Sequence, residues 1–173
     1  GEVTVLWKPI KQASLYQALR SLRPLTLASA PSIRLSLPAA DLRRRELKIL
    51  IVEDNRTNQR VALRLLELLG YRADVAISGS EAITALGRQH YDVILMDMRM
   101  PDMGGLEATR QIRQMPKHTD TWIIAMTANS MSRDRKQCFA AGMNDYLRKP
   151  IKREALDQAL QRAVANQEQR LPG

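Results

Sequence analysis

Five polar residues stand where apolar stretches of the chain end, and their types suit phosphate chemistry. Glu53 and Asp54 follow LKILIV, Asp97 closes DVILMD, Thr127 follows TWIIAM, and Lys149 comes shortly after DYL. Clustered carboxylates repel one another unless a cation lies among them. Mg²⁺ suits such a cluster, because it binds one or two carboxylates and completes its shell with water and phosphate oxygens. A carboxylate can itself be the nucleophile, with an ammonium and a hydroxyl binding the phosphoryl oxygens.

Each of these residues also has an ordinary structural explanation when it is taken alone. Asp54 could cap the helix that follows it, and Asp97 could begin a turn. Thr127 could bond to the local backbone, and Lys149 could be a solvated strand end. Their joint occurrence at four strand ends favours a small phosphoryl-transfer site over separate coincidences.

The elements that must bring these residues together alternate regularly after residue 46. Short apolar runs rich in β-branched residues predict buried strands, and apolar residues at helical spacing predict helices that end at glycines such as Gly70 and Gly142. Strands are predicted at 47–52, 71–76, 92–97, 121–126 and 145–147, and helices at 55–69, 79–88, 106–115, 132–141 and 153–165. This alternation predicts parallel β-α-β units in a three-layer α/β sandwich, with a ligand crevice at the carboxyl ends of the strands.

The first 46 residues differ in composition from the rest and repeat part of its end. KPIKQASLYQAL (8–19) matches KPIKREALDQAL (149–160) at eight of twelve positions without a gap. Residues 24–46 are rich in Pro, Ser, Ala and Leu, which is typical of a linker. We therefore expect a repeat segment at 1–23, a linker at 24–46, a complete domain at 47–165 and a tail at 166–173. The opening Gly1 in place of Met suggests a part of a longer protein.

Composition argues against several classes of protein. The chain has 173 residues and a net charge of +9, with 45% hydrophobic but only 4% aromatic residues, so its core must be aliphatic. Residues 1–45 hold eight basic residues against two acidic ones, a net charge of +6. A solvated linker explains this charge better than a nucleic-acid-binding role does, because no aromatic residues interleave with the arginines. No apolar run approaches the roughly 20 residues of a membrane helix, so no direct membrane contact is expected. The single Cys138 excludes an internal disulfide and fits a reducing cytosol.

From about Leu47 to Ala165, the sequence resembles a response-regulator receiver domain. ILIVEDN is similar to the family's first strand and acidic pair, LMDMRMP to its D-x-x-M-P pattern, MTAN to its switch segment, and YLRKP to its Lys-Pro turn. The resemblance implies a flavodoxin-like (βα)5 sandwich whose parallel sheet has the strand order 2-1-3-4-5. No element of the family's catalytic pattern is missing from the chain.

The resemblance also implies a role for each matching residue. Asp97 would be the phosphoacceptor, and Lys149 would face the phosphoryl group, joined to Pro150 by a cis peptide bond. Thr127 and Tyr146 would form a switch that responds to phosphorylation. Mg²⁺ would be held by the carboxylates of Glu53, Asp54 and Asp97 and by the backbone carbonyl of Arg99.

VEDNRTNQ and MTAN resemble most closely the receivers attached to hybrid sensor histidine kinases. The implied partner is a histidine kinase or a histidine phosphotransfer domain, whose phosphohistidine would supply the phosphoryl group. The domain would catalyse its own phosphorylation, although no ATP-binding region fits in these residues. LWKPIKQASLYQAL resembles the last strand, turn and helix of another receiver, so residues 1–23 would be the remnant of a preceding receiver-like domain. A cytoplasmic location is expected, in a parent chain that could be membrane-anchored.

Three other functions were weighed against a phosphorelay receiver. A stand-alone response regulator would carry an output domain after residue 165, and a receiver-like segment precedes the domain instead. An aspartyl-phosphate hydrolase would need a second acid two residues after the nucleophile, where Arg99 stands. A pseudo-receiver that acts only as an interaction module usually lacks a motif residue, and this chain lacks none. The sequence makes no prediction of the oligomeric state.

Overall fold

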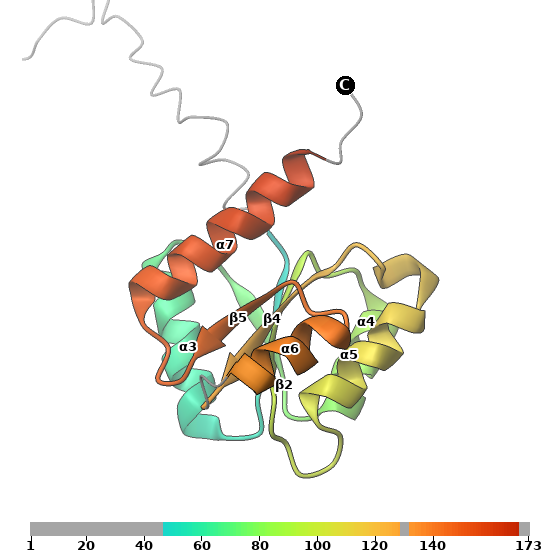
Figure 1. Cartoon of the computed structure of the whole chain (residues 1–173). Helices are drawn as coiled ribbons and strands as arrows, with labels where there is room; N and C mark the ends of the chain where they lie inside the picture. The colour runs from blue at the N-terminus through green and yellow to red at the C-terminus, as the bar shows by residue number, and fades with distance from the viewer. Residues whose placement is uncertain (1–46, 129–131, 170–173) are drawn as a thin grey trace, which may run out of the picture. The chain divides into compact units, whose positions relative to one another are not determined.

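The computed structural model describes residues 47–128 and 132–169, so the predicted remnant at 1–23 and linker at 24–46 lie outside the described residues. Strands and helices alternate along this part of the chain (Figure 1). The strands are β1 (Ile49–Val52), β2 (Ala73–Ala76), β3 (Val93–Asp97), β4 (Trp122–Thr127) and β5 (Asp145–Arg148). The helices are α3 (Arg56–Leu68), α4 (Gly79–Arg88), α5 (Gly105–Gln114), the short 3-10 helix η1 (Pro116–His118), α6 (Ser132–Ala140) and α7 (Arg153–Glu168).

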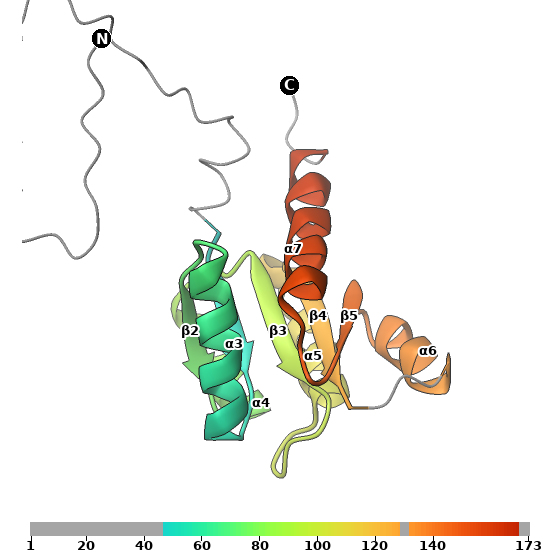
Figure 2. The ribbon, with the colours of Figure 1, turned by 90° about the vertical axis from the view of Figure 1, so that its left-hand side faces the viewer.

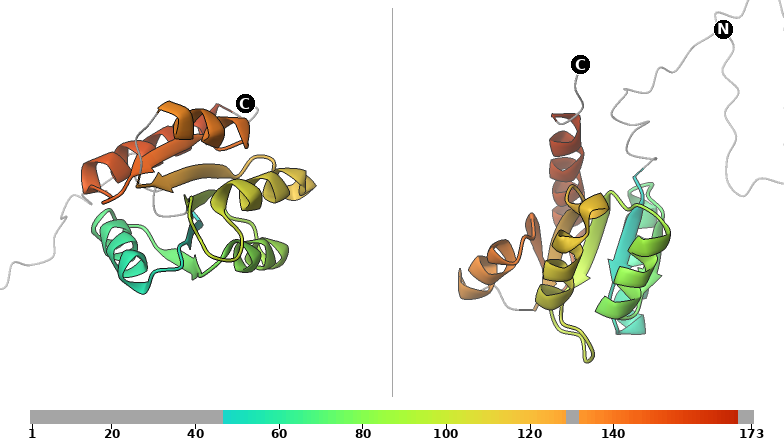
Figure 3. Two further views of the ribbon diagram at one scale, coloured as in Figure 1. Left: turned by 60° about the horizontal axis from the view of Figure 1, so that its bottom comes forward. Right: turned by 90° about the vertical axis from the view of Figure 1, so that its right-hand side faces the viewer.

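The strands form one parallel sheet in the order β2-β1-β3-β4-β5, which confirms the order that the resemblance implied. Helices cover both of its faces and complete the predicted three-layer sandwich. Figure 2 shows α3 and α7 in front of the sheet, and the right-hand view of Figure 3 shows α4 and α5 on the opposite face. Because the strands are parallel, all their carboxyl ends lie at one edge.

The core consists of two apolar clusters, one on each face of the sheet. Every residue of β1 and β3 is buried, as expected for the central strands of a doubly covered sheet. Successive side chains point to opposite faces. Ile49 and Ile51 therefore pack with residues of α3 and α7, whereas Leu50 and Val52 pack with residues of α4, α5 and α6. This burial on both faces explains why the strand sequences are continuous apolar runs.

Two glycines end helices where the sequence predicted that they would. Gly70 follows α3 with a φ of 85°, and Gly142 follows α6 with a φ of 98°. Residues with a side chain rarely adopt these angles, whereas glycine adopts them without steric cost. The Lys149–Pro150 peptide bond is cis, as the resemblance implied.

The structure differs from the sequence prediction mainly at the boundaries of elements. Helix α7 continues to Glu168, so residues 166–168 of the predicted tail belong to it, because no Gly or Pro stands between Ala165 and Pro172 to stop the helix. The 3-10 helix η1 was not predicted, although Pro116 at its start is a favourable first residue. None of the helices in the described part of the chain has the length and apolarity needed to cross a bilayer.

Candidate functional site

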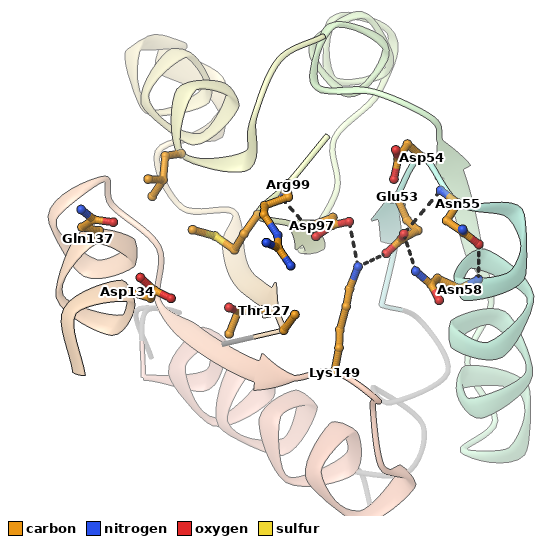
Figure 4. A pocket seen from close by; sticks show the side chains of 13 residues that line it. Glu53, Asp54, Asn55, Asn58, Asp97, Arg99, Thr127, Asp134, Gln137 and Lys149 are labelled. Atoms are coloured by element: carbon orange, nitrogen blue, oxygen red, sulfur yellow. Dashed lines mark hydrogen bonds and ion pairs between the residues drawn. The ribbon is translucent and has the colours of Figure 1, made fainter. Parts of the chain in front are cut away.

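A pocket of about 650 Å³ opens at the edge of the sheet where the strands end (Figure 4). The structure brings together here all five polar residues singled out in the sequence: Glu53, Asp54, Asp97, Thr127 and Lys149. They come from the ends of four strands or the adjoining loops, Glu53 and Asp54 both following β1, as the parallel topology requires. Arg99, in the loop after β3, also lines the pocket.

Three carboxylates form the acidic side of the pocket. One oxygen each from Glu53, Asp54 and Asp97 lies within 4.8 Å of the other two. Glu53 and Asp97 are buried, with 1% and 6% of their surface exposed, whereas Asp54 is exposed. Asp54 is not the N-cap of α3, because the Asn55 side chain accepts hydrogen bonds from the backbone N–H groups at the start of that helix. The Asp54 carboxylate therefore remains available to the pocket.

The Glu53 carboxylate is held from two sides. Its Oε1 accepts a hydrogen bond from Asn58 Nδ2 at 2.8 Å, and its Oε2 contacts Lys149 Nζ at 2.5 Å. The Gln59 side chain donates to the Glu53 carbonyl at 2.7 Å. The sequence analysis missed both amide side chains. They could have been found in the sequence from their position: both lie in the first turn of the helix that follows the acidic pair, so their side chains can reach the strand end.

Both oxygens of the Asp97 carboxylate have a donor. Oδ2 lies 2.7 Å from Lys149 Nζ, and Oδ1 accepts a hydrogen bond from the backbone N–H of Arg99 at 3.2 Å. The backbone around Asp97 is packed tightly as well, because a Cβ at Gly105 would lie 2.3 Å from the Asp97 carbonyl oxygen. Asp97 is therefore fixed by its neighbours, with its carboxylate directed toward the pocket in Figure 4.

The Lys149 ammonium lies between two of the three carboxylates. It reaches Glu53 and Asp97 from the turn after β5, and its side chain is 19% exposed. The backbone N–H of Lys149 donates to the Thr127 carbonyl at 2.7 Å, which aligns this turn with the end of β4. A cation in this position compensates the mutual repulsion of the acids.

The two switch residues implied by the resemblance lie in different surroundings. Thr127 is buried at the end of β4 and lines the pocket. Tyr146 does not line it, but packs against the apolar cluster beneath α6 and lines a separate groove with Trp122 and Arg135. The register pairs Tyr146 with Ala125, two residues before Thr127, so Thr127 and Tyr146 are on the same face of the sheet.

Helix α6 supplies a wall of the pocket that the sequence analysis did not foresee. Asp134 and Gln137 line the pocket on this side, as Figure 4 shows. Behind them, the buried Cys138 Sγ lies 3.7 Å from Met98 Sδ. Burial raises the pKa of the Cys138 thiol, and the nearby Asp134 carboxylate raises it further. The thiol is therefore protonated at neutral pH and is a poor nucleophile.

This arrangement suits a cation-assisted reaction at Asp97. A buried carboxylate faces an open pocket, two further carboxylates lie close enough to share a divalent ion, and an ammonium and a hydroxyl border the same space. These groups can bind and neutralise an incoming phosphoryl group.

Known proteins share both the sequence and the fold of this region. The family model described as response regulator receiver domain matches residues 49–161. The chain is 41% identical over 132 residues to hybrid signal transduction histidine kinase K of Dictyostelium discoideum, covering 72% of this chain and 11% of that protein. It is 36% identical over 126 residues to the histidine-protein kinase BarA of Escherichia coli (strain K12), covering 73% of this chain and 14% of that protein. The chain thus spans only a small part of the curated relatives it matches.

Solved structures show the same fold. The receiver domain of sensor histidine kinase PA1611 from Pseudomonas aeruginosa PAO1 is 47% identical, with a TM-score of 0.64, and the match covers 69% of this chain and 98% of that one. That structure holds a magnesium ion in its active site cleft. The chemotaxis protein CheY4 of Vibrio cholerae is 29% identical, with a TM-score of 0.65 and coverage of 68% and 98%.

Proposed function

Because the chain belongs to the response regulator receiver domain family, we propose that Asp97 accepts a phosphoryl group from a phosphohistidine in a two-component phosphorelay. The observation that carries this proposal is the setting of Asp97 at the end of β3. Its carboxylate faces the pocket, lies 2.7 Å from an ammonium, and shares a 4.8 Å cluster with two other acids. In this setting a carboxylate can act as the nucleophile while its neighbours neutralise the charge of the incoming group.

The three acids also fit a magnesium ion. Opposite ligands of an octahedral Mg²⁺ lie about 4.2 Å apart, twice the bond length of ~2.1 Å, and the three carboxylate oxygens lie within 4.8 Å of one another. Glu53, Asp54 and Asp97 would hold the ion together with the Arg99 carbonyl. When bound, Mg²⁺ would supply positive charge to the phosphoryl oxygens. The magnesium ion in the related receiver of PA1611 supports this assignment.

The transfer consists of nucleophilic attack by Asp97 on phosphorus and departure of the donor imidazole. One Asp97 carboxylate oxygen forms the new bond to phosphorus, and the bond from phosphorus to the imidazole nitrogen of the donor histidine breaks. The electron pair of that bond stays on the imidazole, which leaves as a good leaving group. Lys149 then pairs with a phosphoryl oxygen in place of the Asp97 oxygen that it contacts at 2.7 Å, and the Thr127 hydroxyl binds another.

We further propose that phosphorylation moves Thr127 and Tyr146 together. Both residues are on the face of the sheet that α6 covers, and the register places them on neighbouring strands. A shift of the Thr127 hydroxyl toward the phosphoryl group would open space beneath α6 for the Tyr146 ring. Such a shift changes the relative populations of two arrangements of β4, β5 and α6, which a partner can distinguish.

The phosphodonor would be a histidine kinase or a histidine phosphotransfer domain, and the parent chain a hybrid sensor histidine kinase. The relatives of this chain that are histidine kinases support this context. The domain would work in the cytoplasm, where such donors carry their phosphohistidine.

The repeat in the sequence supports a second receiver-like domain upstream. Within α7, four residues are fully buried, each with 0% exposed surface: Leu156, Ala159, Leu160 and Ala163. The first copy has the same residues at the first three of these positions, Leu15, Ala18 and Leu19. The two copies are thus identical at these core-facing positions of a receiver's last helix, whereas exposed positions are identical in some cases, such as Gln158, and different in others, such as Arg153. We therefore propose that residues 1–23 end a receiver-like domain, followed by a linker at 24–46 and the receiver proper from residue 47.

The proposed function is tested by intact mass after incubation with acetyl phosphate and Mg²⁺. We expect the parent chain to gain one phosphoryl group, and chelation of Mg²⁺ or the substitution Asp97→Asn to abolish the gain. Asp102→Asn is a matched control, because Asp102 lies in the same loop but bonds to Ser80, away from the pocket. Labelling that persists in Asp97→Asn would show that another residue is the nucleophile.

A further inference from the structure

An arginine of α6 lies against the aromatic ring that the proposed switch must move. The Arg135 guanidinium carbon is 4.9 Å from the centroid of the Tyr146 ring and 5.7 Å from that of the Phe139 ring. Both distances fall within the roughly 6 Å at which a cation is attracted to the face of an aromatic ring. Helix α6 lies beside the edge strand β5 that carries Tyr146, as Figure 2 shows. The contact therefore joins the helix and the strand through the switch residue itself.

No carboxylate competes for this arginine within the described part of the chain. Salt bridges there involve other cations, and Asp145, which directly precedes Tyr146, is paired with Arg162 at 2.7 Å. The side chain of Phe139 is 43% exposed, which makes it an unusual surface residue unless it supports its neighbour. The two rings are thus the partners that the structure gives to the positive charge of Arg135.

The contact lies in a groove that is separate from the pocket of Asp97. Arg135, Phe139 and Tyr146 line one groove with Trp122, whereas Thr127 and Asp97 line the pocket at the end of the strands. A movement of the Tyr146 ring toward Thr127 takes it out of this groove. The ring would then leave the guanidinium, and the energy of the contact would be lost in the switched state.

We propose that Arg135 is a positioning residue that holds Tyr146 in its unswitched position and thereby weakens the response of the site to phosphorylation. The inference rests on the proposed function, because it requires that Tyr146 moves inward when Asp97 is phosphorylated. A contact made in only one of two states shifts the equilibrium toward that state, and it lowers the apparent affinity for any ligand that prefers the other. For a partly exposed cation and ring the expected factor is about twofold to fivefold.

The test is a titration of the full chain with beryllofluoride in the presence of Mg²⁺, because beryllofluoride mimics a phosphoryl group bound to a carboxylate. Trp122 lines the same groove as Arg135 and Tyr146, so its fluorescence reports on their arrangement. The only other tryptophan, Trp7, is replaced by Phe in every variant to isolate this signal. We expect Arg135→Gln to lower the beryllofluoride midpoint by about twofold to fivefold.

Two controls separate positioning from a general effect of charge or folding. Lys136→Gln removes the neighbouring cation of the same helix, for which the structure gives no ring contact, and it should leave the midpoint unchanged or raise it slightly. In a Tyr146→Leu background, Arg135→Gln should have no effect, because the ring on which it acts is gone. A merely structural role of Arg135 would persist in that background.

The outcomes distinguish this inference from the function on which it rests. A normal response of the parent with an unchanged or higher midpoint for Arg135→Gln would overturn the positioning role alone. A lower midpoint that persists in the Tyr146→Leu background would overturn it too, because the effect would not pass through the ring. A parent chain that shows no response to beryllofluoride with Mg²⁺ would overturn the proposed function, and the inference with it.

Discussion

At the scale of single residues, the ammonium of Lys149 pairs with two of the three acids that would hold a metal ion. Its Nζ contacts Glu53 at 2.5 Å and Asp97 at 2.7 Å, and these are two of the three carboxylates that cluster within 4.8 Å. A divalent ion at this cluster would bind carboxylates that already have a cationic partner. Lys149 and Mg²⁺ would therefore compete for the negative charge of the same two carboxylates, whereas in the phosphorylated state both would find phosphoryl oxygens to bind.

This competition predicts opposite effects of one substitution on metal binding and on phosphorylation. Lys149→Met should tighten Mg²⁺ binding by about threefold to tenfold, because a competing positive charge is removed. The same variant should be phosphorylated more slowly by acetyl phosphate, because no ammonium replaces the lost charge on the phosphoryl oxygens. Calorimetric titration with Mg²⁺ and mass spectrometry check the two effects.

The matched control is Lys152→Met, which removes an exposed cation three residues further along. It should change neither quantity appreciably. Weaker Mg²⁺ binding by Lys149→Met would contradict the competition and would mean that the lysine arranges the carboxylates for the metal.

At the scale of elements, the connection from β3 to α5 is packed against Asp97, the proposed phosphoacceptor. Gly105 is the first residue of α5, and a Cβ there would lie 2.3 Å from the carbonyl oxygen of Asp97 and 3.0 Å from Met96 Cγ. Real Cβ atoms do not approach a carbonyl oxygen so closely, and a backbone atom at the core of the sheet cannot move aside freely. Glycine at this position therefore lets the helix begin directly beside the strand end.

Gly105→Ala should therefore damage stability and the site together. We expect the free energy of unfolding in urea to fall by about 1–3 kcal/mol, the usual cost of overpacking. Mg²⁺ binding should weaken as well, because the clash displaces Asp97. Gly87→Ala is the control, because no atom lies within 4 Å of a Cβ built there in helix α4, and it should be neutral or stabilising by up to about 1 kcal/mol. Equal effects of the two substitutions would disprove the close approach.

At the scale of the whole molecule, one buried histidine links stability to pH. His118 is 4% exposed in η1, and the His90 ring is stacked on it at a centroid distance of 5.7 Å. Burial lowers the pKa of His118, the charges of His90 and Lys117 lower it further, and a hydrogen bond to the Leu86 carbonyl partly opposes them. Its pKa in the folded state thus lies below the ordinary value of 6.5.

The sign of the pH effect follows from proton binding. Below pH 6.5 the unfolded chain takes up a proton on this histidine before the folded chain does. The stability linked to His118 is therefore fully present above that pH and is lost as the pH falls below it. Between about pH 7.5 and about pH 5.5, the urea midpoint of the parent should fall more than that of His118→Phe. The exposed His90 serves as the control, and His90→Gln should behave largely like the parent. Parallel pH profiles for the parent and His118→Phe would contradict the linkage.

The sequence was sufficient for the main features of the domain because they depend on local signals. Buried strands require continuous apolar runs, helices end at glycines, and polar residues at the ends of parallel strands must meet at one edge. These signals located β1 to β5 and the five polar residues at the strand ends. The family resemblance supplied the strand order, which local patterns alone do not fix.

The missed features depend on contacts between parts that are far apart in the sequence. Arg113 is an example, because its guanidinium donates to the carbonyls of Thr121 and Gly142 and to the side chain of Asn144 and so joins α5 to the connections before β4 and β5. In the sequence it is one arginine among many on a helix. The same holds for Asp134 and Gln137, which line the pocket only because α6 packs beside β5. Side chains whose role is set by tertiary packing carry no periodic signal of their own.

The places where the chain enters and leaves the described domain have a consequence for the speed of a relay. β1 starts at the edge of the sheet opposite Asp97, and α7 returns to that edge, where Gln167 donates to Asp92 at the amino end of β3 (Figure 2). The five residues of β3 alone span about 16 Å at ~3.3 Å per residue. A phosphodonor tethered to either end must therefore reach around the whole sheet. Its local concentration at Asp97 is then governed by the length and stiffness of the tether, so that relay rates can evolve through the linker while every site residue stays the same.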